Sequence, residues 1–167
     1  LHGTALGGGL EISLACHYRI AAPSARMGLP ELTLGIIPGA GGTQRMPRLI
    51  GAEKALELMF AGRPIEAPQA VEYGFIDALI EGDLRAGALA WTRELVKQGK
   101  APRRTSEMKV DPVTATPALF ERLAAQGRKL FPNRTVPSLP IAAVQAAARL
   151  PLEAGLLVAP KPPHHSN

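Results

Sequence analysis

The spacing of apolar residues predicts several amphipathic helices, and the clearest one follows residue 51. From Ala52 to Phe60, apolar side chains recur at i, i+3, i+4, i+7 and i+8, which places them on one face of a helix. Gly62 follows closely, and glycine often occupies the left-handed position that ends a helix. We therefore expect a helix that packs one face on the core and stops before Gly62.

Weaker signals of the same kind predict four more helices downstream. A short helix starts near Pro68, a longer one is capped by Asp83, and two more begin near Pro117 and Pro140. Their apolar positions are, in turn, Ala67, Ala70 and Val71; Leu84, Ala88, Trp91 and Leu95; Leu119, Leu123 and Leu130; and Ile141, Val144 and Ala148. Residues 100–117 have few large apolar side chains, so we expect an exposed connection there.

Short strands are expected around the turn signals of the first eighty residues. Residues 18–22 and 26–28 have strand patterns, and the Pro-Ser pair between them indicates a turn. Residues 75–80 predict another short strand or extended edge. Residues 35–42 contain too much glycine and proline for a regular element, so we expect a tight loop, with Thr43 capping the next helix.

The segment from Gly3 to Ala22 is apolar almost throughout, and Leu10, Ile12 and Leu14 predict a helix buried on nearly all sides. Glu11 interrupts this segment, and an ionised carboxylate is costly to bury without a partner.

Several partners for Glu11 are compatible with the sequence. A core arginine such as Arg19 or Arg45 would neutralise it, or the carboxylate would reach the amides at the start of its own helix. The third interpretation is catalytic, and it depends on the cluster of Gly7, Gly8 and Gly9. Glycine lets a ligand approach the N–H groups of a helix start, which stabilise negative charge. Gly8 N–H and Glu11 would then form an oxyanion donor beside a general acid or base.

Glu31 is the second candidate acid or base, at the predicted boundary between a strand and a loop. Pro30 fixes its own φ and restrains Leu29, so the carboxylate is presented on a stiff backbone. A glutamate after proline is also common on protein surfaces, and both interpretations remain open at this point.

Composition narrows the classes of function. The net charge is +5, but the basic residues are spread along the chain and only 4% of residues are aromatic, which disfavours nucleic-acid binding. One cysteine, Cys16, excludes an intrachain disulfide, and the histidines lack metal-ligand spacing, so we expect no metal site. No apolar run is long enough to span a bilayer. These features predict a soluble cytoplasmic protein.

Nucleotide-binding loops are not supported either. A G-x-G-x-x-G pattern starting at Gly7 requires glycine where Ile12 stands, and one starting at Gly39 requires glycine where Gln44 stands. No Gly-Lys-Ser/Thr sequence is present.

Four blocks together resemble the crotonase, or enoyl-CoA hydratase/isomerase, superfamily. They are HGTALGGGLEISLAC (2–16), YRIAAP (18–23), GLPELTLGIIPGAGGTQRMPRLIG (28–51) and the helix that ends in AGRPI. The resemblance implies an α/β fold, in which residues 1–80 form the C-terminal part of a ββα spiral core, residues 81–156 a helical extension and residues 157–167 a disordered tail. The extension resembles the region that joins hydratase and dehydrogenase parts in multifunctional β-oxidation enzymes.

The resemblance assigns residues to functions. In hydratases of this family, one catalytic glutamate follows the glycine cluster and the second lies twenty residues later, positions that Glu11 and Glu31 match. The backbone N–H of Gly8 matches an oxyanion donor. We expect substrate binding and loop support from the remaining conspicuous residues of these blocks, Gly7, Gly9, Pro30, Gly39, Gly41 and Gly42.

The implied reaction is the addition of water to a trans-2-enoyl-CoA, with coenzyme A as part of the substrate and no separate cofactor. Two glutamates favour a hydratase over a Δ3,Δ2-enoyl-CoA isomerase, which typically uses only the second position. A non-catalytic CoA-binding or oligomerisation module is the other alternative. Because the chain starts inside a motif at Leu1, we expect it to be a fragment. Its expected substrate is an acyl-CoA thioester, and its expected protein partners are either a second copy of the chain or the missing hydratase and dehydrogenase segments.

Overall fold

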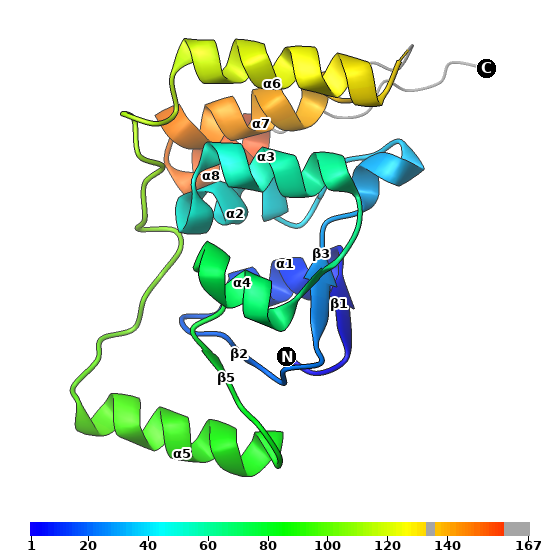
Figure 1. Cartoon of the computed structure of the whole chain (residues 1–167). Coiled ribbons are helices and arrows are strands. Elements are labelled where there is room, and N and C mark those ends of the chain that lie inside the picture. Colours follow the sequence, from blue (N-terminus) through cyan, green and yellow to red (C-terminus); the bar gives the residue numbers. More distant parts are fainter. Residues whose placement is uncertain (133–135, 159–167) are drawn as a thin grey trace.

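The computed structural model describes residues 1–132 and 136–158, and combines two small sheets with packed helices (Figure 1). The elements follow one another as β1 (Thr4–Leu6), α1 (Gly8–Leu14), β2 (Ile20–Ala21), β3 (Arg26–Gly28), the 3-10 helix η1 (Glu31–Leu34), α2 (Gly42–Ile50), α3 (Ala52–Ala61), β4 (Ile65–Glu66), α4 (Ala67–Tyr73), β5 (Ala78–Leu79), α5 (Leu84–Lys97), α6 (Pro117–Leu130), α7 (Ser138–Arg149) and α8 (Leu152–Val158). Strands and helices alternate through the first eighty residues, as the expected α/β class requires.

Parallel pairing dominates the two sheets. Strand β1 pairs in parallel with β3, with Leu6 opposite Gly28, and β4 adds to β3 in the antiparallel sense. Strands β2 and β5 form a separate parallel pair. Parallel neighbours require a crossover connection, and α1 lies in the connection from β1 to β3. The chain therefore leaves β1 and β3 at the same edge of their sheet.

The helix predictions hold where the local signals are strong. Helix α3 ends at Ala61, and Gly62 adopts a left-handed φ of 60°. Helix α5 begins after Asp83, whose carboxylate accepts a hydrogen bond from Ala86 N at 3.0 Å. Helix α6 begins at Pro117 as predicted, and Thr116 caps it through a bond from Leu119 N at 3.2 Å.

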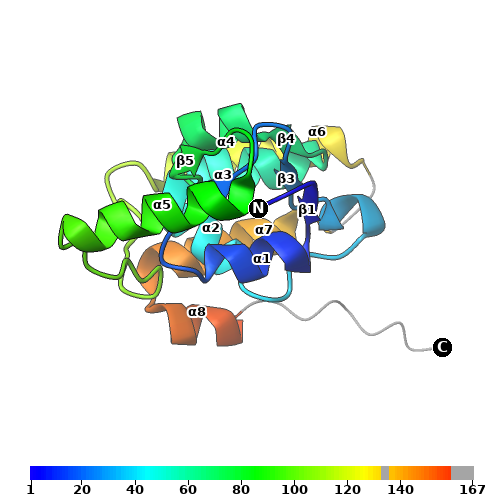
Figure 2. The ribbon, with the colours of Figure 1, turned by 90° about the horizontal axis from the view of Figure 1, so that it is seen from below.

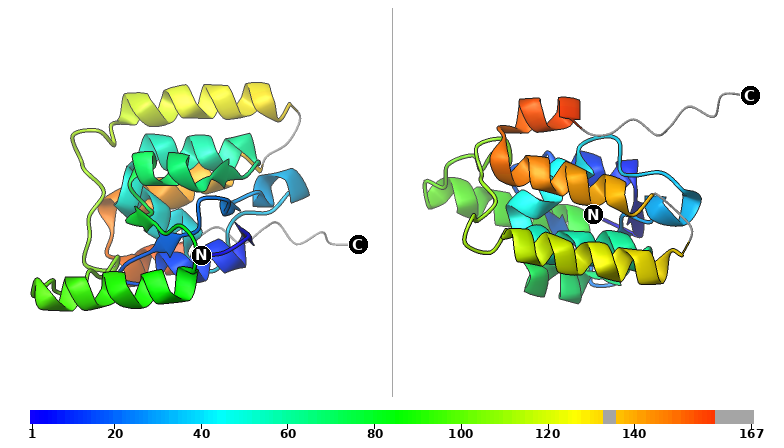
Figure 3. Two further views of the ribbon diagram at one scale, coloured as in Figure 1. Left: turned by 60° about the horizontal axis from the view of Figure 1, so that its bottom comes forward. Right: turned by 90° about the horizontal axis from the view of Figure 1, so that it is seen from above.

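The core is continuous across the predicted boundary after residue 80. It includes Leu10 and Leu14 from α1, Leu56 and Met59 from α3, Leu123 from α6 and Val144 from α7. Helix α7 packs on α2 and α3, and α6 packs on α3 and α7, an arrangement visible from two sides in Figure 3. The connection at 100–116 is largely exposed as expected, although Thr105 and Val110 are buried.

Two local predictions near the N-terminal part are wrong. The expected long buried helix is a strand followed by the seven-residue α1, and the Ile12 side chain is 72% exposed. Leu10 and Leu14 are one helical turn apart and both face the core, so Ile12 between them points away from it. Thr43 does not cap α2. The cap position is Gly41 with φ of 102°, and Thr43 is buried inside the helix.

The apolar stripe of α5 is only half-buried, and no residue of this helix is fully buried. Figure 1 shows α5 at one end of the molecule, away from the other helices. In α6, Leu119 and Leu123 are buried as predicted, whereas Leu130 is 52% exposed at the helix end.

Helix α8 was not expected. Leu157 and Val158 of the predicted tail are its last residues, and residues 159–167 lie outside the described residues. No helix in the described parts of the chain is long and apolar enough to cross a membrane.

Candidate active site

The parallel pairing of β1 and β3 brings the two glutamates to one place. Leu6 and Gly28 are partners at the ends of the strands, and Gly7 N donates to Gly28 O at 3.0 Å just beyond them. Glu11 follows in the first turn of α1, and Glu31 is the first residue of η1. Residues twenty positions apart in sequence therefore emerge from the same sheet edge.

Glu11 is held by a neighbouring helix start. Its side chain is 3% exposed, and Oε1 accepts hydrogen bonds from Gly42 N at 2.7 Å and from Ala40 N at 2.9 Å. Gly42 is the first residue of α2, and the N-terminus of a helix stabilises negative charge. The amides that satisfy Glu11 thus belong to α2 and its loop, not to α1 as one interpretation of the sequence suggested.

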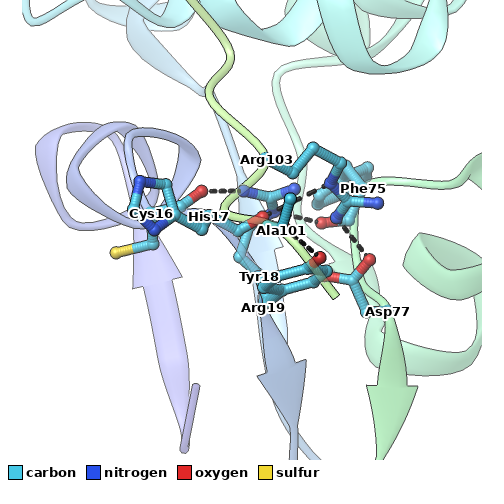
Figure 4. Close-up of polar contacts among 8 residues, drawn as sticks. All are labelled: Cys16, His17, Tyr18, Arg19, Phe75, Asp77, Ala101 and Arg103. Atoms are coloured by element: carbon cyan, nitrogen blue, oxygen red, sulfur yellow. Dashed lines mark hydrogen bonds and ion pairs between the residues drawn. The ribbon is translucent and has the colours of Figure 1, made fainter. Parts of the chain in front are cut away.

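Neither of the arginines considered as partners binds Glu11. Arg45 donates to Thr105 Oγ1 at 2.7 Å, and no ion pair found among residues 1–132 and 136–158 includes Glu11. Arg19 is buried elsewhere. Figure 4 shows it donating to the carbonyl oxygens of Phe75 and Cys16, both at 2.6 Å, beside an ion pair between Asp77 and Arg103. This cluster joins β2 to the segment before β5 and leaves Glu11 without a cation.

The loop that carries the Glu11 partners requires glycine at particular positions. Gly41 adopts φ of 102°, which disfavours any residue with a Cβ atom. A Cβ on Gly42 would lie 2.9 Å from Glu11 Oε1 and 3.0 Å from Pro38 Cβ. A Cβ on Gly39, in contrast, would meet no atom within 4 Å. The predicted loop support therefore rests on Gly41 and Gly42.

Glu31 has a different environment. Its side chain is 8% exposed, and Oε2 is buried without a hydrogen-bond partner in the described structure. Pro30 precedes it at the N-cap position of η1, which fits the predicted stiff backbone. Burial raises the pKa of the Glu31 carboxyl; a hydrogen bond with its own backbone partly opposes this, and the nearby charge of Glu11 adds to it. Protonated Glu31 is accordingly favoured more than an exposed glutamic acid would be.

The glycine cluster begins beside the Glu31 carboxylate and leads into the helix that carries Glu11. Gly7 adopts φ of 52° as the N-cap of α1, and a Cβ there would approach Glu31 Oε1 to 3.0 Å. Gly8 and Gly9 are exposed, and a Cβ on either would meet no atom within 4 Å. Gly8 N–H is at the first position of α1, where no partner exists within the helix. Gly8 is exposed, and its N–H group has no acceptor in the described part of the chain.

This arrangement joins a carboxylate held as a hydrogen-bond acceptor, a second carboxyl whose pKa is raised by burial, and an exposed helix start. Pairs of carboxyl groups whose environments differ in this way serve as acid and base in many enzymes.

Comparison with known proteins shows the family of the chain. The sequence profile described as enoyl-CoA hydratase/isomerase matches residues 1–132. The chain belongs to the enoyl-CoA hydratase/isomerase family. The matched residues include both glutamates, all the glycines discussed above and the helices from α1 to α6.

Named relatives of the chain within this family are multifunctional proteins. The peroxisomal bifunctional enzyme of Cavia porcellus is 40% identical over 157 residues, which cover 94% of this chain and 22% of that protein. The glyoxysomal fatty acid beta-oxidation multifunctional protein MFP-a of Brassica napus is 41% identical over 160 residues, again covering 93% of this chain and 22% of the relative. The chain therefore spans about a fifth of the length of these relatives.

A solved structure supports the fold. An enoyl-CoA hydratase subunit from Geobacillus kaustophilus has 30% sequence identity and a TM-score of 0.51, with 94% of this chain and 48% of that chain covered. The mixed helix-and-strand architecture is thus that of the crotonase fold, as the sequence predicted.

Three features of the site were missed from the sequence. Ala40 was not singled out, because a backbone donor leaves no signal in residue type. Gln44 was considered only as a mismatch to a phosphate loop, although it is completely buried. Helix α8 contacts α2 close to the Glu11 partners. Pro47 lies about one turn after Gln44 on the same side of α2, and this apolar neighbour is the one signal that could have drawn attention to Gln44.

Proposed function

We propose that this chain provides the acid/base part of an enoyl-CoA hydratase, which adds water to trans-2-enoyl-CoA thioesters in fatty-acid β-oxidation. The observation that carries the proposal is the contrast between two nearby carboxyl groups. Glu11 is held by two N–H groups, whereas Glu31 has a buried unpaired oxygen and a raised pKa. The names of the multifunctional relatives support β-oxidation as the setting.

In this reaction Glu11 accepts a proton from water as the water oxygen bonds to the β-carbon of the enoyl group. Glu31 delivers a proton to the α-carbon, which its raised pKa suits. Negative charge develops on the thioester oxygen between these steps. The accessible N–H of Gly8 is placed to stabilise that charge, and removal of one such donor typically costs about 3 kcal/mol of barrier.

Exposed apolar side chains flank both glutamates in sequence. Leu6 and Ile12 surround the glycine cluster, while Leu34 and Ile36 follow Glu31. Such a surface suits an acyl chain. We infer that coenzyme A enters only as part of the substrate, and that no separate cofactor takes part.

The test is hydration of crotonyl-CoA by the whole chain, followed as loss of absorbance of the conjugated thioester. Glu11→Gln and Glu31→Gln should each lower kcat by about 10²–10⁴-fold, the usual contribution of a positioned acid or base. Glu57→Gln, an exposed glutamate on α3, is the matched control and should leave kcat unchanged. Full hydration by Glu11→Gln would contradict its assignment.

Isomerisation of a Δ3-enoyl-CoA is the second activity to measure, because the family includes isomerases. If the Glu11→Gln variant loses hydration but still isomerises the Δ3-enoyl-CoA, Glu31 alone performs the proton transfer of the isomerisation. A folded chain that shows neither activity would contradict the proposal for this chain and would favour a non-catalytic CoA-binding or oligomerisation module.

The cellular compartment stays a prediction. The sequence suggested the cytoplasm, whereas the relatives include proteins named for the peroxisome and the glyoxysome. Assembly with a second copy, or with further hydratase and dehydrogenase segments, likewise stays a prediction.

A further inference from the structure

Helices α7 and α8 lie beyond residues 1–132, the part that matches the family, yet both contact α2. In Figure 2, α8 is at the edge of the molecule beside α7. We propose that Gln44 is a positioning residue for Glu11, and that α7 and α8 hold Gln44 in place. The effect of Gln44 on catalysis rests on the proposed function. The packing that connects α8, Gln44 and the Glu11 carboxylate does not depend on it.

Gln44 is the centre of the link. Its side chain is fully buried, and Nε2 donates to Ala143 O of α7 at 2.7 Å. Oε1 accepts from Arg48 Nη1 at a longer distance of 3.4 Å. Gln44 lies two residues after Gly42, in the first turn of α2. A buried amide that lost these partners would have no water to replace them, so it fixes the start of α2 against α7.

Helix α8 closes over the other side of Gln44. A Cβ on Gly155 would lie 2.0 Å from Gln44 Oε1 and 2.9 Å from its Cδ. Only glycine at this position lets α8 approach the amide without displacing it. The adjacent Leu156 places Cδ2 3.4 Å from the position of a Cβ on Gly41, the N-cap of α2.

Arg48 fixes the turn between α7 and α8 to the same helix. Its Nη1 donates to Gln44 O at 2.6 Å, and its Nη2 donates to Leu150 O at 2.8 Å. The guanidinium is 5% exposed and bridges one backbone oxygen from α2 and one from the α7–α8 connection. The position of α8 is therefore coupled to α2 by both side-chain packing and hydrogen bonds.

The contacts that begin at α8 and pass through Gln44 end at the Glu11 carboxylate. Gly42 N–H, which binds Oε1 at 2.7 Å, belongs to the turn of α2 that contains Gln44. A shift of this short helix moves the donor, because the hydrogen-bonded backbone of one turn moves as a unit. A displacement of α8 at Gly155 thus reaches Glu11 through Gln44 and Gly42.

The experiment compares Gly155→Ala with Gly127→Ala in the full chain. Both glycines are buried in helices, but a Cβ on Gly127 would meet Pro137 Cβ at 3.0 Å and Phe60 Cζ at 3.3 Å, atoms of the N-cap of α7 and of α3 and not of α2. Hydrogen exchange of the Gly42 and Ala40 amides is measured by NMR. Gly155→Ala should speed exchange at both amides by about tenfold relative to the core amides of α3. Gly127→Ala should leave this ratio unchanged.

Gln44→Met provides a second variant in case Gly155→Ala does not fold. Methionine retains the volume but cannot donate to Ala143 O, and the same two amides should exchange faster. Unchanged relative exchange in the folded variants would overturn the proposal, as would an equal change caused by Gly127→Ala.

The kinetics of hydration distinguish a positioning role from a merely structural one. Gly155→Ala and Gln44→Met should lower kcat with little change in KM, because the displaced Gly42 and Ala40 N–H groups no longer hold the Glu11 carboxylate in place. Gly127→Ala should leave kcat unchanged. If the parent chain does not hydrate crotonyl-CoA, the proposed function fails, while the exchange data still confirm or overturn the link.

Discussion

Glu11 and Glu31 have the same type of side chain, but the Glu11 carboxylate lies at the start of α2 and the Glu31 carboxylate lies against Gly7 at the start of α1. Glu11 is in contact with backbone donors of α2, and its Oε1 accepts two hydrogen bonds. Glu31 is packed against Gly7, its Oε2 has no partner among the described residues, and its pKa is raised chiefly by burial. The comparison shows that backbone hydrogen bonds at one glutamate and burial at the other give two side chains of one type different environments.

Each carboxylate also depends on a glycine from another element of the structure. Gly42 leaves room for Glu11, and Gly7 leaves room for Glu31. The two glycines differ because Gly7 also requires a positive φ, whereas the constraint on Gly42 is only one of space. Substitutions can therefore test the two halves of the site separately.

The largest loss of stability is expected for Glu11→Leu. Leucine leaves the buried Gly42 N–H and the Ala40 N–H without their acceptor, at a cost of about 2–4 kcal/mol in the free energy of unfolding. Glu11→Gln retains an acceptor oxygen and should cost about 1 kcal/mol or less. Urea denaturation of both variants measures the difference. Equal losses would show that the two N–H bonds do not hold the side chain.

Gly42→Ala should disturb Glu11 without removing it. The new Cβ would lie 2.9 Å from Oε1, and overpacking of this kind costs about 1–3 kcal/mol. Gly39→Ala is the matched control in the same loop, where a Cβ meets open space, and should change stability by about 0.5 kcal/mol or less. Thermal unfolding of the pair gives the comparison, and a loss for both would point to the loop backbone instead of the contact.

Gly7→Ala should act on the Glu31 side. Alanine at φ of 52° costs about 1–2 kcal/mol, and its Cβ approaches Glu31 Oε1. Gly8→Ala, one residue later in α1, should be neutral or slightly stabilising because its Cβ is free and alanine favours the helix. Denaturant midpoints of the two variants check this. A destabilised Gly8→Ala would contradict the open helix start.

The smallest effect, and the one of opposite sign, is expected for Glu31→Gln. Because the pKa of Glu31 is raised in the folded state, the folded chain binds the proton more tightly than the unfolded chain. Stability then falls as pH rises from the ordinary carboxyl range through the raised pKa. Glutamine removes this penalty, so the variant should match the parent at acidic pH and exceed it at neutral pH. Denaturant unfolding curves of the parent and the variant at acidic and at neutral pH test this prediction. A Glu31→Gln variant less stable than the parent at neutral pH would mean that the fold stabilises ionised Glu31.

Local signals were sufficient for several elements. The period of apolar residues located α3, and Gly62 marked its end. Asp83 located the start of α5, and Pro117 the start of α6. These features involve residues within one or two helical turns of each other, so neighbouring residue types carry the information.

Other assignments failed because they depend on residues far apart in the chain. Ile12 has the same apolar character as Leu10 and Leu14, but the face that α1 presents to the core leaves it exposed. Thr43 has the residue type of a cap, yet Gly41 supplies the turn and α2 buries Thr43. Propensity is a weak guide wherever packing decides which face of an element is covered.

The sequence by itself was enough to single out the two glutamates and their glycine neighbours as candidates and to indicate the family of the chain. These are patterns of residue type at short spacing. Only the tertiary structure decided that the donors to Glu11 come from Ala40 and Gly42, and that Gly155 of α8 packs on Gln44. Nearly all residues have a backbone N–H group, so residue type does not show which of these groups binds a given side chain. Contacts between residues more than a hundred positions apart produce no periodic pattern in the sequence. The partners of both kinds are fixed only when the chain packs.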